Sequence, residues 1–164
     1  MKYSLFKSAL LVLLLSAGIA ACSVSKEGRT MKKTIDGNWI LETITTEGIT
    51  GIAKTTVFNE AEMSCFIGSE WSFVANNSTG SYTIVDNKKG CPAVKRFIRW
   101  TVYEPKDSAK EFQFKRLDEK KNAMDNGAGY RLTFTALDKN MMKLKTAITF
   151  NGNPAALIYN FVKK

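Results

Sequence analysis

The chain has 164 residues and is basic, with 24 Lys and Arg against 15 Asp and Glu and a formal net charge of +9 at pH 7. It contains no histidine, which removes the most common general base near neutral pH and the most common metal ligand. No glycine-rich phosphate loop follows a predicted strand. The composition therefore argues against an enzyme and predicts neither a cofactor nor a metal site.

The first 21 residues have the organisation of a bacterial export signal. Lys2 and Lys7 form a charged start, residues 9–15 are apolar, and small residues lead to Cys22. The apolar run is too short to span the ~30 Å core of a bilayer. Residues 19–22 (IAAC) resemble a bacterial lipobox, which implies that the Cys22 thiol is lipidated and that residues 1–21 are removed as a signal peptide. A secretory signal with a chance cysteine and a transmembrane helix remain the alternatives.

The resemblance to a lipobox also predicts where the protein lies. Ser23 follows the cysteine, as in many Gram-negative lipoproteins that are sorted to the outer membrane. We therefore expect an outer-membrane lipoprotein of the cell envelope that faces the periplasm or the outside and has the membrane as a partner through its lipid anchor. Such a protein meets anionic headgroups and acidic glycans, so we expect no nucleic-acid partner. The basic residues are spread along the chain, as on ordinary solvated faces.

Residues 22–36 are polar and basic and show no apolar period, which predicts a flexible tether between the lipid and a single domain over residues 37–164. Two cysteines lie in this domain, Cys65 and Cys91. An even pair in an oxidising compartment predicts a disulfide, worth roughly 3 to 4 kcal/mol. The alternative, Cys65 as a reactive nucleophile, lacks a histidine to activate it.

Short segments rich in β-branched and aromatic residues recur from Gly37 onward, separated by Gly, Asn, Asp or Pro, which is typical of an all-β sandwich or barrel. Residues 39–44 form the first predicted strand, and residues 54–58 form a short segment before a predicted helical turn. Asn59 and Glu62 have the spacing of a helix capping box. This spacing predicts one helical turn that runs into Cys65 and serves as a lid or end plug.

Seven further strands are predicted after this turn. Residues 69–74 and 81–85 flank a turn rich in Asn and Gly and predict a hairpin. Residues 95–103 are apolar on both faces, which predicts cover on both sides at least in part, whereas residues 111–117 and 130–137 alternate. Residues 142–150 and 155–162 flank Asn151 and Gly152, the strongest hairpin signal in the chain. Closing eight antiparallel strands into an up-and-down barrel would remove both sheet edges.

The chain resembles a known family of such barrels. Gly37 and Trp39 match the Gly-x-Trp motif that opens lipocalin barrels, and residues 58–73, 76–82 and 157–161, with Cys91, are similar to lipocalin-like lipoproteins of Bacteroidota. The resemblance covers residues 36–164 and implies an eight-stranded antiparallel β-barrel in which Trp39 packs the closed end. The Thr-Asp-Tyr signature of many lipocalins is absent, and no arginine lies on the last predicted strand to stack over Trp39.

The candidate binding residues follow from this barrel. Arginine holds carboxylates and phosphates well, so Arg99 is a candidate polar anchor, as are Arg96 and Arg131, the last of which is expected to point outward. The aromatic side chains that are expected to line or fill the interior are Trp71, Phe73, Trp100, Phe112, Tyr130 and Phe134.

We therefore expect a barrel that binds a small apolar or amphipathic ligand without catalysis. The alternative is a filled barrel that acts through its loops as an accessory subunit or inhibitor of a cell-envelope protein. An open interior on the order of several hundred Å³ would favour the ligand, and a packed interior would favour the protein partner.

Overall fold

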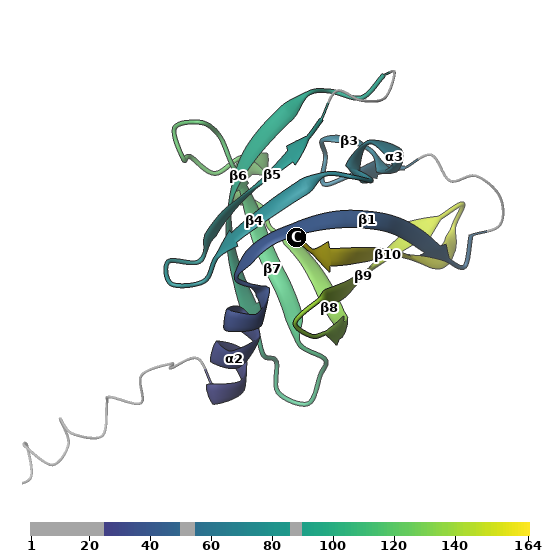
Figure 1. The fold of residues 1–164 in the computed structure, drawn as a ribbon. Helices are drawn as coiled ribbons and strands as arrows, with labels where there is room; N and C mark the ends of the chain where they lie inside the picture. Colours follow the sequence, from purple (N-terminus) through teal and green to yellow (C-terminus); the bar gives the residue numbers. More distant parts are fainter. Residues whose placement is uncertain (1–24, 50–54, 86–89) are drawn as a thin grey trace, which may run out of the picture.

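Eight antiparallel strands of the chain close into one barrel (Figure 1). The computed structural model describes residues 25–49, 55–85 and 90–164. The expectations for residues 1–24, the lipobox and Cys22 among them, lie outside the described residues. The barrel strands are β1 (Gly37–Glu47), β4 (Glu70–Val74), β5 (Thr79–Ile84), β6 (Val94–Tyr103), β7 (Glu111–Leu117), β8 (Tyr130–Leu137), β9 (Met141–Phe150) and β10 (Asn153–Lys163).

The strand order confirms the expected up-and-down β-barrel. Each strand pairs with its neighbours in the order β1–β10–β9–β8–β7–β6–β5–β4, and the ring closes because β1 pairs with both β4 and β10. Trp39 of β1 lies opposite Trp71 on one side and Lys163 on the other. A register shift between Leu41 and Thr43 marks a bulge, which bends β1 as it passes between its two neighbours.

Most predicted strands are found with small shifts at their ends. β7 and β8 cover the predicted residues, and the hairpin between β9 and β10 turns at Asn151 (φ 49°) and Gly152 (φ 79°), as predicted. In β6, the side chains of Ile98, Trp100 and Val102 are buried. The opposite face of β6 is largely open to solvent, so cover on that face is partial.

The prediction of a flexible tether up to Asp36 is wrong for most of that segment, which forms helix α2 (Lys26–Ile35). The Ser25 hydroxyl caps the helix by accepting a hydrogen bond from the Gly28 backbone N–H (2.9 Å). Glu27 in the first turn and basic residues in the last turn suit the helix dipole. Among the described residues, no helix has both the length and the apolar character needed to cross a membrane.

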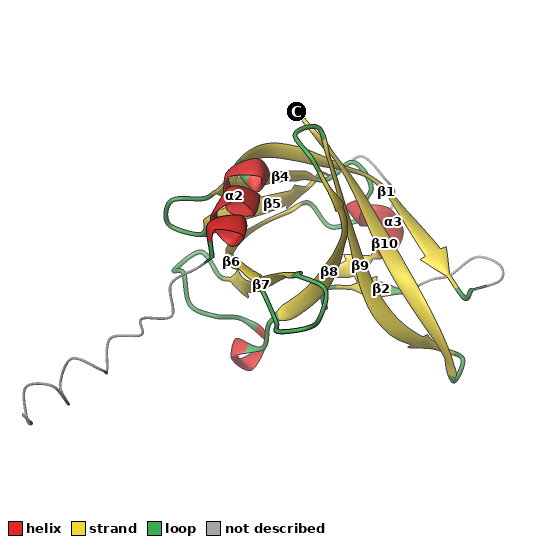
Figure 2. Ribbon diagram, turned by 90° about the horizontal axis from the view of Figure 1, so that it is seen from below, coloured by secondary structure: helices red, strands yellow, loops and turns green. Residues whose placement is uncertain are grey.

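Helix α2 lies at one end of the ring of strands (Figures 1 and 2). Its apolar side is narrow, consisting of buried Ile35 and half-buried Met31, which pack against the core. The Ile35 carbonyl accepts a hydrogen bond from the Trp39 indole N–H (2.7 Å). Lys163 on β10 lies over the Trp39 ring, with its Nζ 5.0 Å from the centroid, so a lysine takes the place of the missing arginine.

The other end of the barrel is closed by the segment between β1 and β4. Here β2 (Thr56–Val57) and β3 (Ala61–Glu62) form a two-stranded ribbon that leads into a single helical turn, α3 (Met63–Phe66). We call residues 55–66 the plug. The expected helical turn and end plug are therefore present, but the capping box is wrong: Asn59 has a positive φ (50°), Glu62 belongs to β3, and no side chain caps α3.

Truncation of Trp39 should destabilise the barrel strongly. The side chain is fully buried, so Trp39→Ala loses its contacts and leaves a cavity, which typically costs about 3 to 5 kcal/mol. Trp39→Phe keeps a ring and loses the hydrogen bond to Ile35, and should cost less. Denaturant titration of the two variants measures both losses. A loss below about 1 kcal/mol for Trp39→Ala would show that this indole does not seal the barrel.

Candidate functional site

Four of the predicted ligand-binding aromatics fill the middle of the barrel. Trp71, Phe73, Trp100 and Phe112 are each at most 2% exposed. Their ring centroids form a continuous series of contacts, at 6.0 Å from Trp71 to Phe73, 5.6 Å from Phe73 to Trp100 and 5.8 Å from Trp100 to Phe112. At such distances the rings touch one another. They are therefore brought together as the sequence predicts, as packing rather than as the wall of an open cavity.

Tyr130 is the first residue of β8, and Phe134 lies near the middle of the strand. Phe134 is half-buried and lines a hollow of about 680 Å³ between α2 and β8, together with Met31 and Leu137. The Tyr130 hydroxyl lies 2.9 Å from the Phe58 carbonyl oxygen in the plug. Phe134 therefore borders an open space at the α2 end of the barrel, whereas the Tyr130 hydroxyl is bound to the plug.

The plug inserts one aromatic ring, Phe58, into the mouth of the barrel. Its centroid lies 5.0 Å from Phe114, 5.2 Å from Tyr130 and 5.3 Å from Tyr159, and it is also close to Phe66. Phe58 itself has a positive φ (51°), a conformation that a bulky residue adopts only when its surroundings hold it there. In the sequence Phe58 only ends a short segment after a loop, and no sequence signal predicts this role.

A disulfide ties the plug to the barrel, as the sequence predicted. Cys65 of α3 is bonded to Cys91 in the segment between β5 and β6, 26 residues away, with 5.4 Å between the Cα atoms. The loop that this bond closes adds roughly 3 to 4 kcal/mol in the chain-entropy model. Because Cys65 is bonded, the reading of this residue as a free nucleophile is wrong.

The second fastening is an ion-pair network centred on Glu60 of the plug. The Glu60 carboxylate accepts hydrogen bonds from Arg96 on β6 (2.7 and 2.8 Å), from Arg116 on β7 (2.5 Å) and from the Tyr82 hydroxyl (3.1 Å). Arg116 also donates two hydrogen bonds to Asp125 (2.8 and 2.6 Å). Two carboxylates thus face two guanidinium groups, and the Glu60 and Arg116 side chains are 9% and 4% exposed.

The network was not foreseen from the sequence, although one signal was present. Arg116 follows Phe112 and Phe114 at the period of two residues that places side chains on the inner face of β7. An inward arginine in a barrel requires an inward carboxylate, because an unpaired buried charge is very costly. Arg96 is predicted to anchor a ligand, but in the structure its guanidinium group forms an ion pair with Glu60.

The ion pairs determine how these groups titrate. Burial raises the pKa of Glu60, but the hydrogen bond and charge of Arg96 and the charge of Arg116 outweigh it and hold the pKa below its ordinary value. The hydrogen bond from Arg116 likewise lowers the pKa of Asp125. Burial raises the pKa of Tyr130 to about 12. Both carboxylates therefore remain ionised near neutral pH and hold the plug rather than exchange protons.

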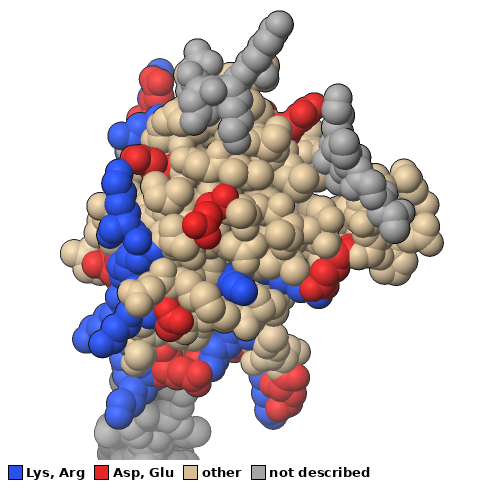
Figure 3. All heavy atoms as spheres, turned by 45° about the vertical axis from the view of Figure 1, so that its right-hand side comes forward, with Lys and Arg blue, Asp and Glu red and all other residues tan. Residues whose placement is uncertain are grey.

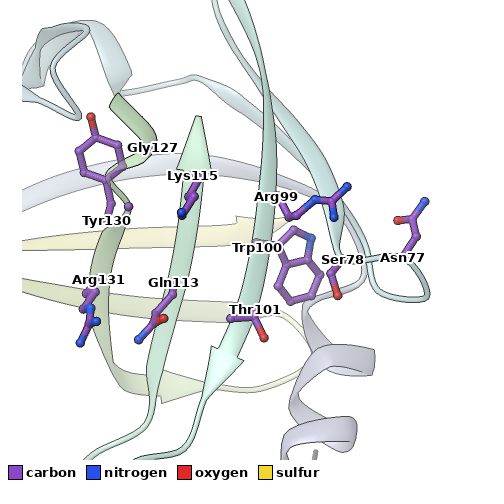
Figure 4. A pocket seen from close by; sticks show the side chains of 11 residues that line it. Asn77, Ser78, Arg99, Trp100, Thr101, Gln113, Lys115, Gly127, Tyr130 and Arg131 are labelled. Carbon is purple, nitrogen blue, oxygen red and sulfur yellow. The ribbon is translucent and has the colours of Figure 1, made fainter. Parts of the chain in front are cut away.

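The remaining predicted site residue, Arg99, lies outside the barrel. It is exposed on the outer face of β6, because the alternation that buries Trp100 turns its neighbour outward. Arg131 points outward as predicted. Both line a hollow of about 690 Å³ over β6, β7 and β8, with Lys115 between them on β7 (Figure 4). The structure thus separates Arg99 from the aromatic set with which the sequence grouped it.

Charge is unevenly distributed over the surface. The face seen from the side of α3 and β1 is mostly uncharged, and Lys and Arg side chains gather towards one edge of it (Figure 3). Within the three described ranges, no group of three or more Cys, Asp or Glu side chains is arranged to hold a metal ion.

Comparison with known proteins adds little to the geometry. No protein-family model matches the sequence, and no curated protein matches it. The crystal structure of a lipocalin-like protein from Bacteroides uniformis is similar to the chain, with a TM-score of 0.44 and 13% identity over 80% of this chain and 99% of that one. A TM-score of 0.44 is too low to assign a fold, so the barrel is assigned from the strand pairing alone. Membership of a Bacteroidota lipoprotein family stays a prediction.

The Glu60 network should make stability depend on acid. A lowered pKa in the folded state means that the Glu60 carboxylate stabilises the fold above its ordinary pKa of 4.5 and loses this effect as pH falls through the folded-state value. Glu60→Gln should therefore cost about 3 kcal/mol at pH 7 and progressively less below pH about 4.5. Denaturant titrations from pH 7 to pH 3 measure the difference.

The matched control is Glu42→Gln, because Glu42 is an exposed carboxylate on β1. Its substitution should change stability by less than about 0.5 kcal/mol across the same range. A Glu60→Gln loss that does not shrink in acid would show that the charge of Glu60 is not what holds the plug.

Proposed function

We propose that the protein is a non-catalytic lipoprotein of the bacterial cell envelope whose lipocalin-like barrel acts through its outer surface and loops, as an accessory subunit or inhibitor of another envelope protein. The observation that carries this proposal is the filled interior. Aromatic rings in mutual contact occupy the middle of the barrel, and the plug occupies one end. The packed interior favours this function over the binding of a small ligand inside the barrel.

The plug makes the filled state hard to open. Entry from that end would have to displace the Phe58 ring, break the ion pairs of Glu60 and move against the disulfide at Cys65. Removing one partner from a buried ion pair alone costs about 3 to 5 kcal/mol. Ligand uptake by this route would therefore be opposed by three separate interactions that hold the plug in place.

A second candidate, binding of a small apolar ligand, is favoured by the hollow beside Phe134. It lies at the end where α2 packs and is lined partly by apolar side chains from α2 and β8. Its apolar lining includes Met31, Ala136 and Leu137. The two candidate functions can be distinguished by measuring whether an apolar molecule binds near the buried tryptophans.

We further propose that the barrel is held close to the membrane by lipid on Cys22. Because α2 begins at Lys26, only Ser23 to Ser25 separate it from the cysteine, and this stretch reaches at most about 14 Å. The end of the barrel that carries α2 then faces the lipid surface. Lys26 and Lys33 of α2 are exposed, and each basic residue near anionic lipid adds about 1 kcal/mol to membrane attraction.

A brominated fatty acid should not quench the tryptophan fluorescence of the wild-type protein at stoichiometric concentrations. Trp71 and Trp100 are 2% exposed, so a filled interior keeps the bromine atoms away from them. Phe134→Ala, which removes the half-buried ring beside the α2 hollow, is the matched variant and should permit quenching. Saturable quenching of the wild type at a ratio of one to one would favour the ligand-binding candidate and contradict the proposal.

Loss of the Cys22 thiol should release the protein from membranes. For this test the Cys22→Ala variant carries a secretory signal peptide whose cleavage does not require lipidation. The substitution removes the anchor and leaves only the weak attraction of the basic residues. Incorporation of an alkyne-labelled fatty acid should disappear, and the protein should move to the soluble fraction. The control Lys26→Gln/Lys33→Gln keeps the cysteine and should stay in the membrane fraction. Unchanged fatty-acid labelling of Cys22→Ala would refute lipidation at this residue.

A further inference from the structure

We propose that the hollow over β6, β7 and β8 binds a ligand that carries phosphate or sulfate groups. The inference depends on the proposed function only in placing binding on the outer wall of the barrel. It is carried by three cationic side chains that line the hollow from three neighbouring strands, Arg99 on β6, Lys115 on β7 and Arg131 on β8 (Figure 4).

The strand register fixes the spacing of the three cations. Arg99 lies directly opposite Lys115 across β6 and β7, and Arg131 lies opposite Gln113 across β7 and β8. Directly opposed side chains on one face start from Cβ atoms about 5 Å apart, and diagonal neighbours about 7 to 8 Å apart. The cations can therefore reach one multivalent oxyanion, or two phosphate groups that are joined by a short linker.

None of the three side chains forms an ion pair with another residue that the structure describes. Five other cations of the described residues do form ion pairs: Arg96 and Arg116 with Glu60, Arg116 also with Asp125, Lys110 with Glu27, Lys145 with Glu47 and Lys164 with Glu70. The structure assigns no such pair and no side-chain hydrogen bond to Arg99, Lys115 or Arg131. Like charges directly opposite each other on a sheet are destabilising. The arrangement of Arg99 and Lys115 therefore works against stability, which is expected of a site and not of a structural contact.

The neutral groups of the hollow suit the same ligand. Thr101, Gln113 and Arg131 lie in one row across β6, β7 and β8, and the Ser78 hydroxyl lies at the edge of the hollow. The Gln113 amide N–H donates a hydrogen bond to Glu111 (2.8 Å), which leaves its carbonyl oxygen and second N–H free. Ser78 accepts a hydrogen bond from Lys32 (2.7 Å), which leaves its own O–H to donate. No Asp or Glu is among the lining residues. Arginine suits such a site because its planar guanidinium group binds phosphate oxygens through two parallel hydrogen bonds.

Calorimetric titration of the purified full chain with tripolyphosphate tests the site. The variant Arg99→Gln/Lys115→Gln/Arg131→Gln should bind at least about tenfold more weakly than the wild type, because hydrogen bonds from charged groups are lost. The control Lys106→Gln/Lys120→Gln/Lys139→Gln removes the same charge from exposed positions outside the hollow and should bind like the wild type. The affinity of the wild type should fall as salt is added.

Two further measurements separate the sources of the oxyanion and the role of the fold. Vesicles of phosphatidylcholine with phosphatidylglycerol replace tripolyphosphate in a second titration series. Retention by vesicles that depends on the hollow, without tripolyphosphate binding, would identify a lipid headgroup as the source. The melting temperature of the hollow variant should equal or exceed that of the wild type, because a like-charge pair is removed.

Equal weakening of the hollow variant and the control variant would overturn the proposal, since binding would then reflect net charge alone. Absence of binding to both probes would overturn it as well. Neither result depends on Cys22 lipidation or on the fatty-acid quenching, so failure of this site and failure of the proposed function are distinguishable.

Discussion

The fold depends on how the two ends of the barrel are sealed. Pairing of β1 with both β4 and β10 removes the sheet edges, but it leaves the apolar interior facing water at each end. At one end, Ile35 of α2 packs on the core and its carbonyl binds the Trp39 indole. At the other end, the plug inserts Phe58. Each seal combines apolar packing with specific polar contacts, so the closing segments have a defined position.

The polar contact at the plug end is the costlier one to build. Arg116 sits at an inward position of β7 and is almost fully buried, so its charge requires compensation by Glu60 and Asp125. These two carboxylates come from segments that are far apart in the sequence. The arginine therefore links the plug to the loop after β7, and among the described residues every buried polar side-chain atom has a partner. Stability and position of the plug follow from the same ion pairs.

Period-two alternation was enough to predict the barrel strands, because inward and outward residues of a barrel differ in polarity along each strand. It failed where tertiary contacts decide the structure. Helix α2 has only Met31 and Ile35 as an apolar side, and it is stable because the barrel end supplies a surface for them. The spacing of Asn59 and Glu62 matched a capping box by chance. Glu60, between them, could be assigned only once the inward position of Arg116 was recognised.

A filled interior changes where function can lie on such a barrel. Most inward side chains of the barrel are committed to packing, so selection for binding acts mainly on outward residues and loops, where substitutions cost little stability. The outer face of β6 and β7 carries a like-charge pair, Arg99 and Lys115, that the fold does not need. Arg96 and Arg116 show the contrast, because their guanidinium groups are bonded to Glu60 of the plug and, for Arg116, also to Asp125. Arginines on neighbouring strands thus serve opposite purposes, according to whether the alternation places them inside the barrel or outside it.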